Sequence, residues 1–408
     1  MAAGDTTTVT SGDYTAECLA AVRSGSADRP ITLAGVGMPL LGAINIDHAY
    51  ITVDGFSFRS HRDLGACVYF NCKADHCIIQ NCAFEHTLPD KAQVSMESGD
   101  WGNRPTNMSL FNNRFLGNTY FCVALQGKGH LVKGNYFGTP STVNKTHDGV
   151  GLYLHSSNTL VSQNTWENYD RPNPAAHCDL IQAFTNNGEI ARDNIIERNL
   201  FRNGVGTQLG NLEDQGDHGR IARWTWRNNI WMNIEAGCGI GPDQQYFYNN
   251  VFYRCGTAGP LLFNVAGNTG GNSSGCKVIN NIFYECGTSN KDSVVIGWWG
   301  FNPNGNFGTG FEAHHNLVFG WAGYQGFVKN ATWNQGGQNG HSFNGVDPLF
   351  VNPAGGDFRL KKGSPCIGAG VSFSTEFGDD ANGAPRGDAW DIGAVQTLPP
   401  GTIKPVSR

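Results

Sequence analysis

The segment NNVFYRCG at 249–256 returns almost unchanged as NNIFYECG at 280–287, so Asn249 and Asn280 are 31 residues apart (280 − 249 = 31). Comparable segments, with β-forming residues, then Asn or Asp, then an aromatic residue, recur at intervals of about 20 to 35 residues, which is typical of solenoids. The segments are YITVDGFSF (50–58), CIIQNCAF (77–84), MSLFNNRF (108–115), HLVKGNYF (130–137), TLVSQNTW (159–166), NIIERNLF (194–201), WTWRNNIW (224–231), QYFYNNVF (245–252), KVINNIF (277–283) and EAHHNLVF (312–319).

Apolar residues within each repeat alternate with period two, which indicates strands and not helices. A second short strand lies between successive repeats, as in CVYFN (67–71), GVGLYLH (149–155) and GPLLFNV (259–265). The composition agrees, because 55 glycines and only 15% charged residues favour many short strands and turns. We therefore predict an all-β chain folded as a single-stranded parallel β-helix, a solenoid of about ten coils. A propeller ranks second and a two-sheet sandwich third.

Stacking explains why the repeat is built from asparagine, an aromatic residue and cysteine. Coils that stack at about 4.8 Å place equivalent residues one above another. An Asn at the turn readily adopts the left-handed conformation, and its amide can hydrogen-bond the Asn of the neighbouring coils. We expect the aromatic residue to stack inside the coil. Cys255 and Cys286 are expected in adjacent coils as a thiol pair, although their separation would permit a disulfide.

The Asn-x-Phe repeats and the tail DPLFVNPAGGDFRLKKGSPCIGAG (347–370) resemble the right-handed parallel β-helix proteins of the pectate-lyase-like superfamily. On this resemblance we divide the chain into a lead-in and cap (1–30), a right-handed β-helix (31–345) and a segment that closes the helix end (346–408). The superfamily includes polysaccharide lyases, glycoside hydrolases, uronan epimerases and phage depolymerases. The resemblance therefore predicts the fold more narrowly than the reaction.

Charge and hydropathy limit the class of partner. The net charge is −6 and no run of Lys or Arg occurs, which argues against a nucleic-acid partner. The most hydrophobic stretch near the start, ITLAGVGMPLLGAINI (31–46), is interrupted by glycines and a proline and is too short to span a bilayer, so no membrane partner is expected. We expect that a signal peptide was removed and that the protein is secreted or periplasmic.

Polar residues that the repeat does not require gather in the middle of the chain. THDGVGLYLH (146–155) and HCDLIQAF (177–184) each place an Asp beside a His at the start of a strand. Stacking would make Asp148 and Asp179 neighbours, and two close carboxylates separate their pKa values into an acid and a base, as glycoside cleavage requires. We predict catalytic roles for Asp148, His177 and Asp179. The alternative is that both Asp side chains only cap turns.

The same segment is similar to the polygalacturonase pattern, in which an Asp-Gly strand is followed by a paired Asp and then by Gly-His-Gly. Asp148-Gly149 matches the first element, Asp179 matches part of the second, and His218-Gly219 stands for the third. The Asp-Asp pair and the family's closing Arg-x-Lys are missing. The resemblance therefore does not establish an inverting hydrolase.

The densest polar stretch is NLEDQGDHGR at 211–220. Glu213, Asp214 and Asp217 are oxygen ligands of the kind that Ca²⁺ prefers, although their spacing lacks the later Glu of an EF-hand. Asp214 and His218 are further candidates for catalysis. The alternative is a solvated loop with no ligand.

Lyases of the superfamily abstract the proton beside a uronate carboxylate with Lys or Arg, often with Ca²⁺ bound to the substrate. The resemblance implies that Lys128, Arg220 or Arg223 has this role, and the sequence does not choose among them.

A carbohydrate groove also needs residues that contact sugar rings and hydroxyl groups. Trp298 and Trp299 cannot both face the interior, because successive strand side chains point opposite ways. Trp224 and Trp226 share one face and are expected to pack within the coil. The predicted substrate-binding residues are Gln126, Lys128, His155, Gln182, Gln208, Glu213, Arg220, Asp243 and Trp298.

The sequence thus predicts an enzyme that cleaves a polysaccharide, with uronic acid in the polymer, and leaves lyase and hydrolase both open. An acidic protein that holds a polyanion needs a local basic patch or bound cations. The rival from another class is a non-catalytic β-helix, such as an adhesin, a tail fibre or a glycan-binding scaffold. A uronan C5-epimerase would share the lyase residues and break no glycosidic bond.

Overall fold

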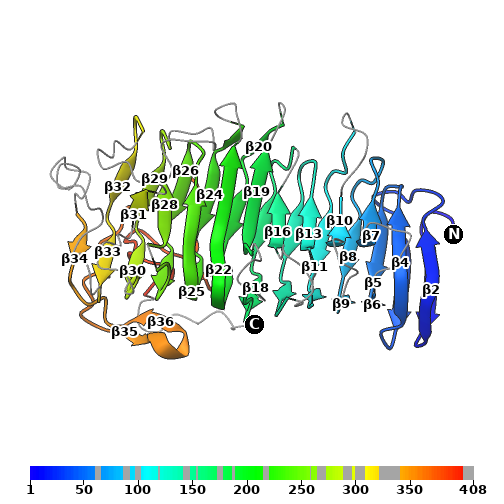
Figure 1. Ribbon diagram of the computed structural model, residues 1–408, viewed down its shortest axis with the longest axis horizontal. Coiled ribbons are helices and arrows are strands. Elements are labelled where there is room, and N and C mark those ends of the chain that lie inside the picture. Colours follow the sequence, from blue (N-terminus) through cyan, green and yellow to red (C-terminus); the bar gives the residue numbers. More distant parts are fainter. Residues whose placement is uncertain are drawn as a thin grey trace. The chain divides into compact units, whose positions relative to one another are not determined.

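The chain forms two compact units in the computed structural model, Met1–Asn194 with Gly204–Thr207, and Ile195–Asn203 with Gln208–Arg408. Nearly all of the described secondary structure is β-strand (Figure 1). The structure describes residues 1–59, 66–85, 92–96, 103–117, 120–140, 148–152, 155–171, 178–185, 189–214, 220–257, 259–263, 273–287, 296–298, 308–320 and 341–397. No helix in these ranges is long and apolar enough to span a bilayer.

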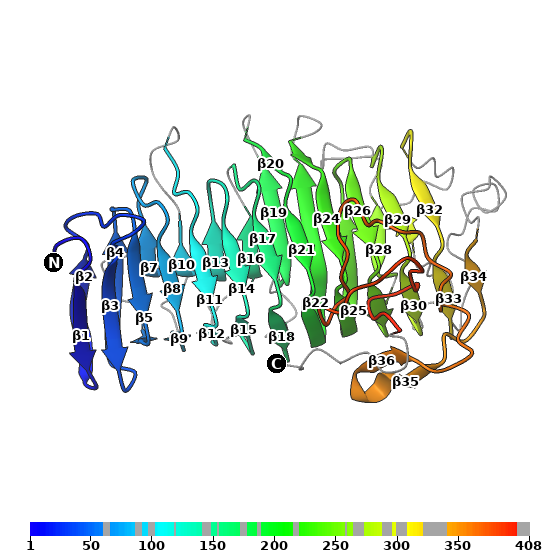
Figure 2. The ribbon, with the colours of Figure 1, turned by 180° about the vertical axis from the view of Figure 1, so that it is seen from behind.

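In the first unit the coils from Ile51–Asp54 (β5) onward each contribute one strand to each of three parallel ladders, and the first ladder also contains two earlier strands. The first ladder contains Thr6–Thr10 (β1), Ile31–Val36 (β3), Ile51–Asp54 (β5), Ile78–Gln80 (β8), Ser109–Phe111 (β11), Leu131–Lys133 (β14) and Leu160–Ser162 (β17). The second contains Ser57–Phe58 (β6), Ala83–Phe84 (β9), Arg114–Phe115 (β12), Tyr136–Phe137 (β15) and Thr165–Glu167 (β18). The third contains Ala66–Phe70 (β7), Ala92–Ser95 (β10), Phe121–Leu125 (β13), Asp148–Leu152 (β16) and Ile181–Thr185 (β19). Figure 2 shows the first ladder in order from β1 to β17.

Two longer strands begin the first unit. Asp13–Ala20 (β2) pairs in parallel with Leu40–Ile46 (β4), and β4 pairs in turn with both β6 and β7. β1 and β2 lie within residues 1–30 and pair with β3 and β4, so strand pairing begins inside the region that the sequence assigns to a lead-in and cap. A short strand, Ala191–Arg192 (β20), lies near the end of the unit.

The second unit repeats this plan. Its first ladder contains Ile195–Glu197 (β21), Trp224–Arg227 (β24), Gln245–Tyr248 (β26), Lys277–Ile279 (β29) and Glu312–His314 (β32). The long strand Ile230–Ile240 (β25) pairs with two further series of strands. Its start pairs with Val251–Tyr253 (β27), and this series continues through Ile282–Tyr284 (β30), Leu317–Phe319 (β33) and Phe343–Asn344 (β34). Its end pairs with Leu261–Phe263 (β28), which pairs in turn with Ile296–Trp298 (β31). The remaining strands are Leu200–Asp214 (β22), of which Gly204–Thr207 belong to the first unit, and Ile221–Ala222 (β23). Parallel strands wound in this order form a right-handed parallel β-helix, which confirms the predicted fold class.

Aromatic residues stack inside the coils, as the repeat predicts. In the first unit the ring centroids of Phe84 and Phe115 are 4.8 Å apart and those of Phe137 and Trp166 are 4.4 Å apart. In the second unit Phe252 stacks on Phe283 at 5.1 Å. These distances match the spacing of neighbouring strands, about 4.8 Å, so the strand ladder itself sets the stacking. Offset-stacked pairs of this kind each add about 1 kcal/mol beyond their buried area.

The two residues of each Asn-Asn pair have different roles. The first, as in Asn249 and Asn280, has a left-handed backbone with φ of 51° and 61°. The second is buried and bonds the coils together: Asn250 Oδ1 accepts the Asn229 backbone N–H at 3.0 Å, and Asn250 donates to Asn281 Oδ1 at 2.9 Å. The sequence assigned both properties to a single asparagine, and the structure divides them between two successive positions.

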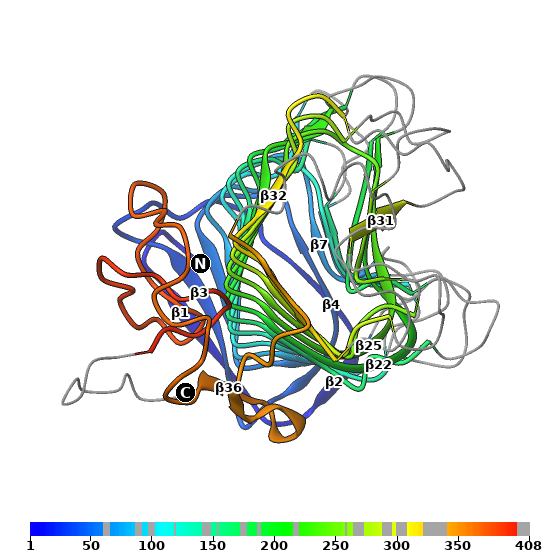
Figure 3. The same cartoon turned by 90° about the vertical axis from the view of Figure 1, so that its left-hand side faces the viewer.

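The C-terminal segment packs along the side of the second unit (Figure 3). It contains an antiparallel pair, Phe350–Asn352 (β35) and Asp357–Leu360 (β36), joined through the short helix Pro353–Gly355 (η1). The left-handed asparagines hold it, since Asn249 donates to the Asp391 carbonyl at 3.0 Å and Asn280 donates to the Val371 carbonyl at 2.8 Å. The described part of this segment, 346–397, lies along the side of the coils, and the closure of the helix end that the sequence predicts for 346–408 stays a prediction.

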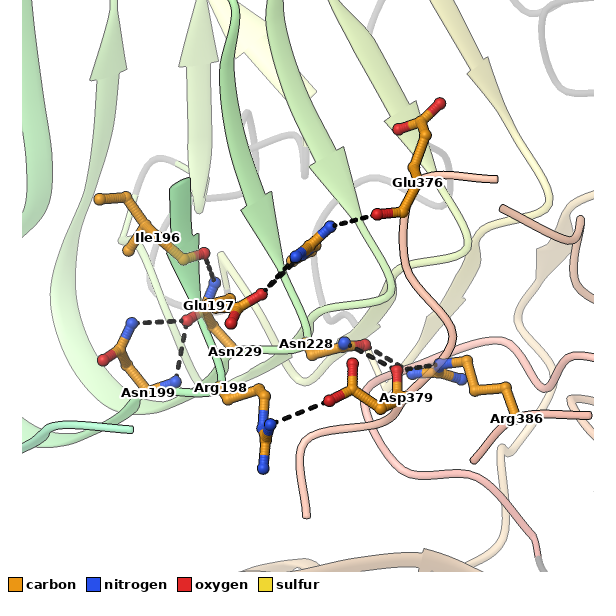
Figure 4. Close-up of polar contacts among 10 residues, drawn as sticks. Ile196, Glu197, Arg198, Asn199, Asn228, Asn229, Glu376, Asp379 and Arg386 are labelled. Atoms are coloured by element: carbon orange, nitrogen blue, oxygen red, sulfur yellow. Dashed lines mark hydrogen bonds and ion pairs between the residues drawn. The ribbon is translucent and has the colours of Figure 1, made fainter. Parts of the chain in front are cut away.

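Arg386 is the centre of this attachment. It is 2% exposed, and its Nη2 donates to Asn228 Oδ1 at 2.7 Å (Figure 4). The same Nη2 donates to the Gly393 carbonyl at 3.1 Å. Figure 4 also shows Arg198 paired with Asp379 at 2.9 Å. Burial lowers the pKa of Arg386 to about 10, and the nearby carboxylates oppose that shift. The guanidinium remains charged at neutral pH and fixes the segment.

Candidate functional site

The third ladder of the first unit carries the residues that the sequence selects for chemistry. Val150 of β16 pairs with Ile181 of β19, so Asp148 and Asp179 occupy the same position in adjacent coils. The Asp179 backbone N–H donates to Asp148 Oδ1 at 2.8 Å, and the Gly149 N–H donates to the Asp179 carbonyl at 2.9 Å. The predicted neighbour relation of these two acids is therefore present in the structure.

Both carboxyl groups are buried, with a relative exposure of 0% for Asp148 and for Asp179. A polymer would contact them only after a neighbouring segment moved. The hydrogen bond from the Asp179 backbone to Asp148 is also the kind of bond expected if both Asp side chains only cap turns. Carboxyl groups are rarely buried unless they are paired or hydrogen-bonded, so two of them in adjacent coils mark a polar layer in the β-helix.

Other polar side chains surround the acids. Cys122 Sγ lies 3.4 Å from the Tyr169 hydroxyl, and the Thr207 hydroxyl donates to Cys178 Sγ at 3.4 Å. All four residues are at most 2% exposed. With the two Asp residues they form the buried polar cluster of the first unit. The sequence pointed to its two Asp residues but gave no signal for Cys122, Tyr169 or Thr207.

Electrostatics keep the thiols and the phenol neutral. Burial raises the pKa of Cys178 well above its ordinary value, the Thr207 hydrogen bond opposes the rise, and charge on Asp148 and Asp179 adds to it. Burial likewise raises the pKa of Tyr169, with smaller contributions from the two cysteines and Asp148. A nucleophilic cysteine needs a lowered pKa. These groups therefore act as a neutral hydrogen-bonding environment and not as nucleophiles.

Glycine at position 149 is required by packing. A Cβ there would lie 2.4 Å from Trp166 Nε1 and 2.6 Å from the Leu180 carbonyl oxygen. Any side chain would push the backbone away from the aromatic stack and displace Asp148 with it. The Asp-Gly pair in the sequence thus has a structural cause that is independent of any family pattern.

Gln126 and Lys128 follow β13. Gln126 is 4% exposed and accepts a hydrogen bond from Arg104 through its side-chain oxygen, whereas Lys128 is exposed. Buried His130 fixes the local backbone, because its Nε2 lies 2.9 Å from the Gln126 carbonyl and its Nδ1 accepts the Met108 N–H at 3.3 Å. Lys128 is therefore the more accessible of the two predicted substrate-binding residues.

We expect acid to weaken the fold at His130. Burial lowers the pKa of His130 from 6.5 to about 4, so the unfolded chain takes up a proton first as the pH falls. The neutral His130 ring contributes about 3 kcal/mol to the free energy of unfolding. This contribution is complete above pH 6.5 and is lost as the pH falls toward 4. Urea unfolding at pH 7 and at pH 4 measures this loss of stability in the wild type and in His130→Asn. Asparagine retains an acceptor for the Met108 N–H, just as Asn194 Oδ1 accepts the Thr159 N–H. An equal loss of stability in both proteins would contradict the assignment.

In the second unit, Glu213 and Asn211 lie on β22. Asn211 Nδ2 donates to Glu213 Oε1 at 2.7 Å, and Asn211 Oδ1 lies 3.0 Å from the Cβ position of Gly239. Arg220 is 9% exposed. The Asp243 carboxylate accepts the Ser274 N–H at 2.7 Å, so this predicted sugar-binding residue caps a turn.

Several predicted residues are only partly described. His177, Asp217 and His218 lie outside the described residues, as do the side chains of Asp214 and Trp298. His155, Gln182 and Gln208 are partly buried, and Gln182 pairs with Gly151. Trp224 and Trp226 are fully buried, which confirms their predicted packing role. Within the described ranges no three His, Cys, Asp or Glu side chains converge on a metal position.

Three of the solved structures similar to this chain are two alginate lyases and a lacto-N-biosidase. The family 6 polysaccharide lyase AlyGC, an alginate lyase, has a TM-score of 0.58 and 16% identity over 98% of this chain and 57% of AlyGC. A family 6 alginate lyase in complex with a trisaccharide has a TM-score of 0.54 and 14% identity over 78% of this chain and 74% of that one. A family 136 lacto-N-biosidase from Eubacterium ramulus has a TM-score of 0.51 and 12% identity over 78% and 62%.

The chain has the β-helix fold of these enzymes. At identities this low the likeness shows the fold alone, and the chain spans little more than half the length of AlyGC. No protein-family profile and no curated protein sequence matches it significantly.

Proposed function

We propose that the protein is a carbohydrate-active enzyme that cleaves glycosidic bonds of a uronic-acid-containing polysaccharide, by lyase β-elimination or by hydrolysis. The observation that carries the proposal is the buried polar cluster around Asp148 and Asp179. A β-helix needs only apolar residues at such positions, so buried titratable groups in adjacent coils indicate a functional layer. The shared fold with alginate lyases and a glycosidase supports the same class.

We assign Asp148 and Asp179 the acid–base chemistry of this layer. Two carboxyl groups at equivalent positions of adjacent coils supply the pair of acids that cleavage of a glycosidic bond requires. A β-elimination requires a base for the proton beside the uronate carboxylate, and exposed Lys128 is the accessible candidate in the first unit. His177, Asp214 and His218 stay candidates from the sequence.

A panel of uronans and neutral glycans tests the proposal with two readouts, ultraviolet absorbance of an unsaturated product and the release of reducing ends. Absorbance that rises with the reducing ends identifies a lyase, and reducing ends without absorbance identify a hydrolase. Neither signal on any polymer would contradict the proposal.

A non-catalytic glycan-binding scaffold is the second candidate. The observation in its favour is that Asp148 Oδ1 already accepts a backbone N–H, which is a structural role. A scaffold would bind a glycan from the panel without cleaving it, and Asp148→Asn would leave binding unchanged.

The proposal includes the Ca²⁺ site that the sequence suggests at Glu213, Asp214 and Asp217. Among described side chains Glu213 already accepts a hydrogen bond from Asn211, so the described residues do not complete a calcium site by themselves. A site would need Asp214 and Asp217 to supply further oxygen ligands to an ion that neutralises the uronate carboxylate. We also propose that the mature protein works outside the cytoplasm, where such polymers occur.

Calcium binding is expected to raise the thermal midpoint of the protein. Saturation at a hundred times Kd stabilises a folded protein by about 2.7 kcal/mol. Differential scanning calorimetry with Ca²⁺ and with EDTA measures the effect, and Glu213→Gln should reduce it. Identical midpoints in Ca²⁺ and EDTA would remove calcium from the account.

A further inference from the structure

A histidine pair ends the first ladder of the second unit. His314 is the last residue of β32, and His315 follows it with a left-handed backbone, φ 51°. The two Nδ1 atoms are 2.8 Å apart, so one ring donates to the lone pair of the other. The His341 ring stacks on His315 with centroids 4.8 Å apart. Neither the repeat nor the proposed function requires three imidazoles at this place.

The separation of the two Nδ1 atoms matches a chelate. Two nitrogen ligands at about 2.0 Å from an ion and at right angles to each other are about 2.8 Å apart, as in square-planar or tetragonal copper and nickel sites. A tetrahedral zinc site would place them about 3.3 Å apart. The 2.8 Å separation is that of the hydrogen bond between the rings, so the rings must turn for both lone pairs to face one ion. Among divalent first-row metals, Cu²⁺ binds such nitrogen ligands most tightly.

The outer contacts of His314 also resemble those of a metal ligand. A ligating imidazole usually directs its second nitrogen toward a carboxylate, which fixes the ring and increases its basicity. His314 Nε2 faces Glu312 Oε2 at 3.9 Å, and Glu312 pairs with Lys277 at 3.3 Å. The His314 side chain is 28% exposed, so an aqueous ion can reach it.

We propose that His314 and His315 chelate a divalent copper or nickel ion through their two Nδ1 atoms. Among the described residues no third protein ligand converges on the ion, so water completes the coordination. The ring that donates between the two Nδ1 atoms moves its proton to Nε2 when the ion binds, and no proton is lost. This site is separate from the proposed cleavage of polysaccharide and does not depend on it.

Isothermal titration calorimetry of the full chain with Cu²⁺ and with Ni²⁺ in a non-chelating buffer tests the proposal. We expect one ion per chain, with Cu²⁺ bound more tightly than Ni²⁺ or Zn²⁺. His314→Asn and His315→Asn should each weaken binding by about 100-fold or more, and Glu312→Gln by roughly 10-fold, as expected for loss of a supporting carboxylate. His315→Asn places asparagine where Asn280 already has the same backbone conformation, so the fold should persist.

His48→Asn, in the first unit, is the matched control and should bind as tightly as the wild type. A wild-type protein that binds neither Cu²⁺ nor Ni²⁺ would overturn the proposal. Undiminished binding by both pair variants, with unchanged thermal midpoints, would overturn it as well, because the ion would then bind elsewhere.

Discussion

Replacing Asn250 with alanine is expected to lower the free energy of unfolding by about 3 to 5 kcal/mol, because several buried polar groups lose their partners at once. Asn250 Oδ1 accepts both the backbone N–H and the side-chain N–H of Asn229, at 3.0 Å each. Its own Nδ2 donates to the Trp226 carbonyl at 2.8 Å and to Asn281 Oδ1 at 2.9 Å. All these groups lie inside the coils, where water does not replace the lost bonds.

Equilibrium urea unfolding measures the change, and Asn382→Ala is its control because Asn382 is exposed. The control should unfold within about 0.5 kcal/mol of the wild type. A loss of less than about 1 kcal/mol for Asn250→Ala would show that the ladder adds little to stability.

Arg386→Met is expected to destabilise the second unit by about 3 to 5 kcal/mol, the usual result of removing one partner from a buried charged network. The methionine retains most of the packing of the side chain but none of its donors. Asp380 and Asp391, each 1% exposed, would lose their nearest buried cation. The Asp379 and Gly393 carbonyls would lose their bonds to the guanidinium, at 3.0 and 3.1 Å.

The local result should be release of the C-terminal segment before the coils unfold. Limited proteolysis should cut Arg386→Met within 365–397 at protease concentrations that leave the wild type intact. Arg359→Met is the matched control, because Arg359 pairs with Asp357 on the surface. Protection of the segment in both variants would show that its apolar contacts alone hold it.

The repeat was sufficient to predict the fold because strand stacking converts sequence offset into spatial register. The 31-residue offset of Phe252 and Phe283 reappears as direct pairing of β27 with β30. Cys255 and Cys286, with the same offset, are free thiols, as predicted. The position of the C-terminal segment was not predictable in this way, because its partners, such as Asn228 and Asn280, are far away in the sequence.

The candidate site was predictable only in part. The shared offset of 31 residues placed Asp148 beside Asp179 correctly, since Asp148 begins β16, Asp179 comes just before β19, and the two strands pair. Their burial and the contribution of Tyr169 were not predictable, because loops and other coils determine what covers a strand end. The histidine pair was missed for another reason: EAHHNLVF fits the repeat, and the pattern gives no sign that His314 and His315 turn their Nδ1 atoms toward each other.

The initial rate of polymer cleavage by Asp148→Asn and Asp179→Asn, relative to wild type, tests the central claim most directly. Asparagine keeps the shape and the acceptor for the Asp179 N–H but cannot exchange a proton. The account predicts rates lower by roughly 100-fold or more, with unchanged thermal midpoints, and a normal rate for the exposed control Asp28→Asn. Wild-type rates in both buried variants would contradict it.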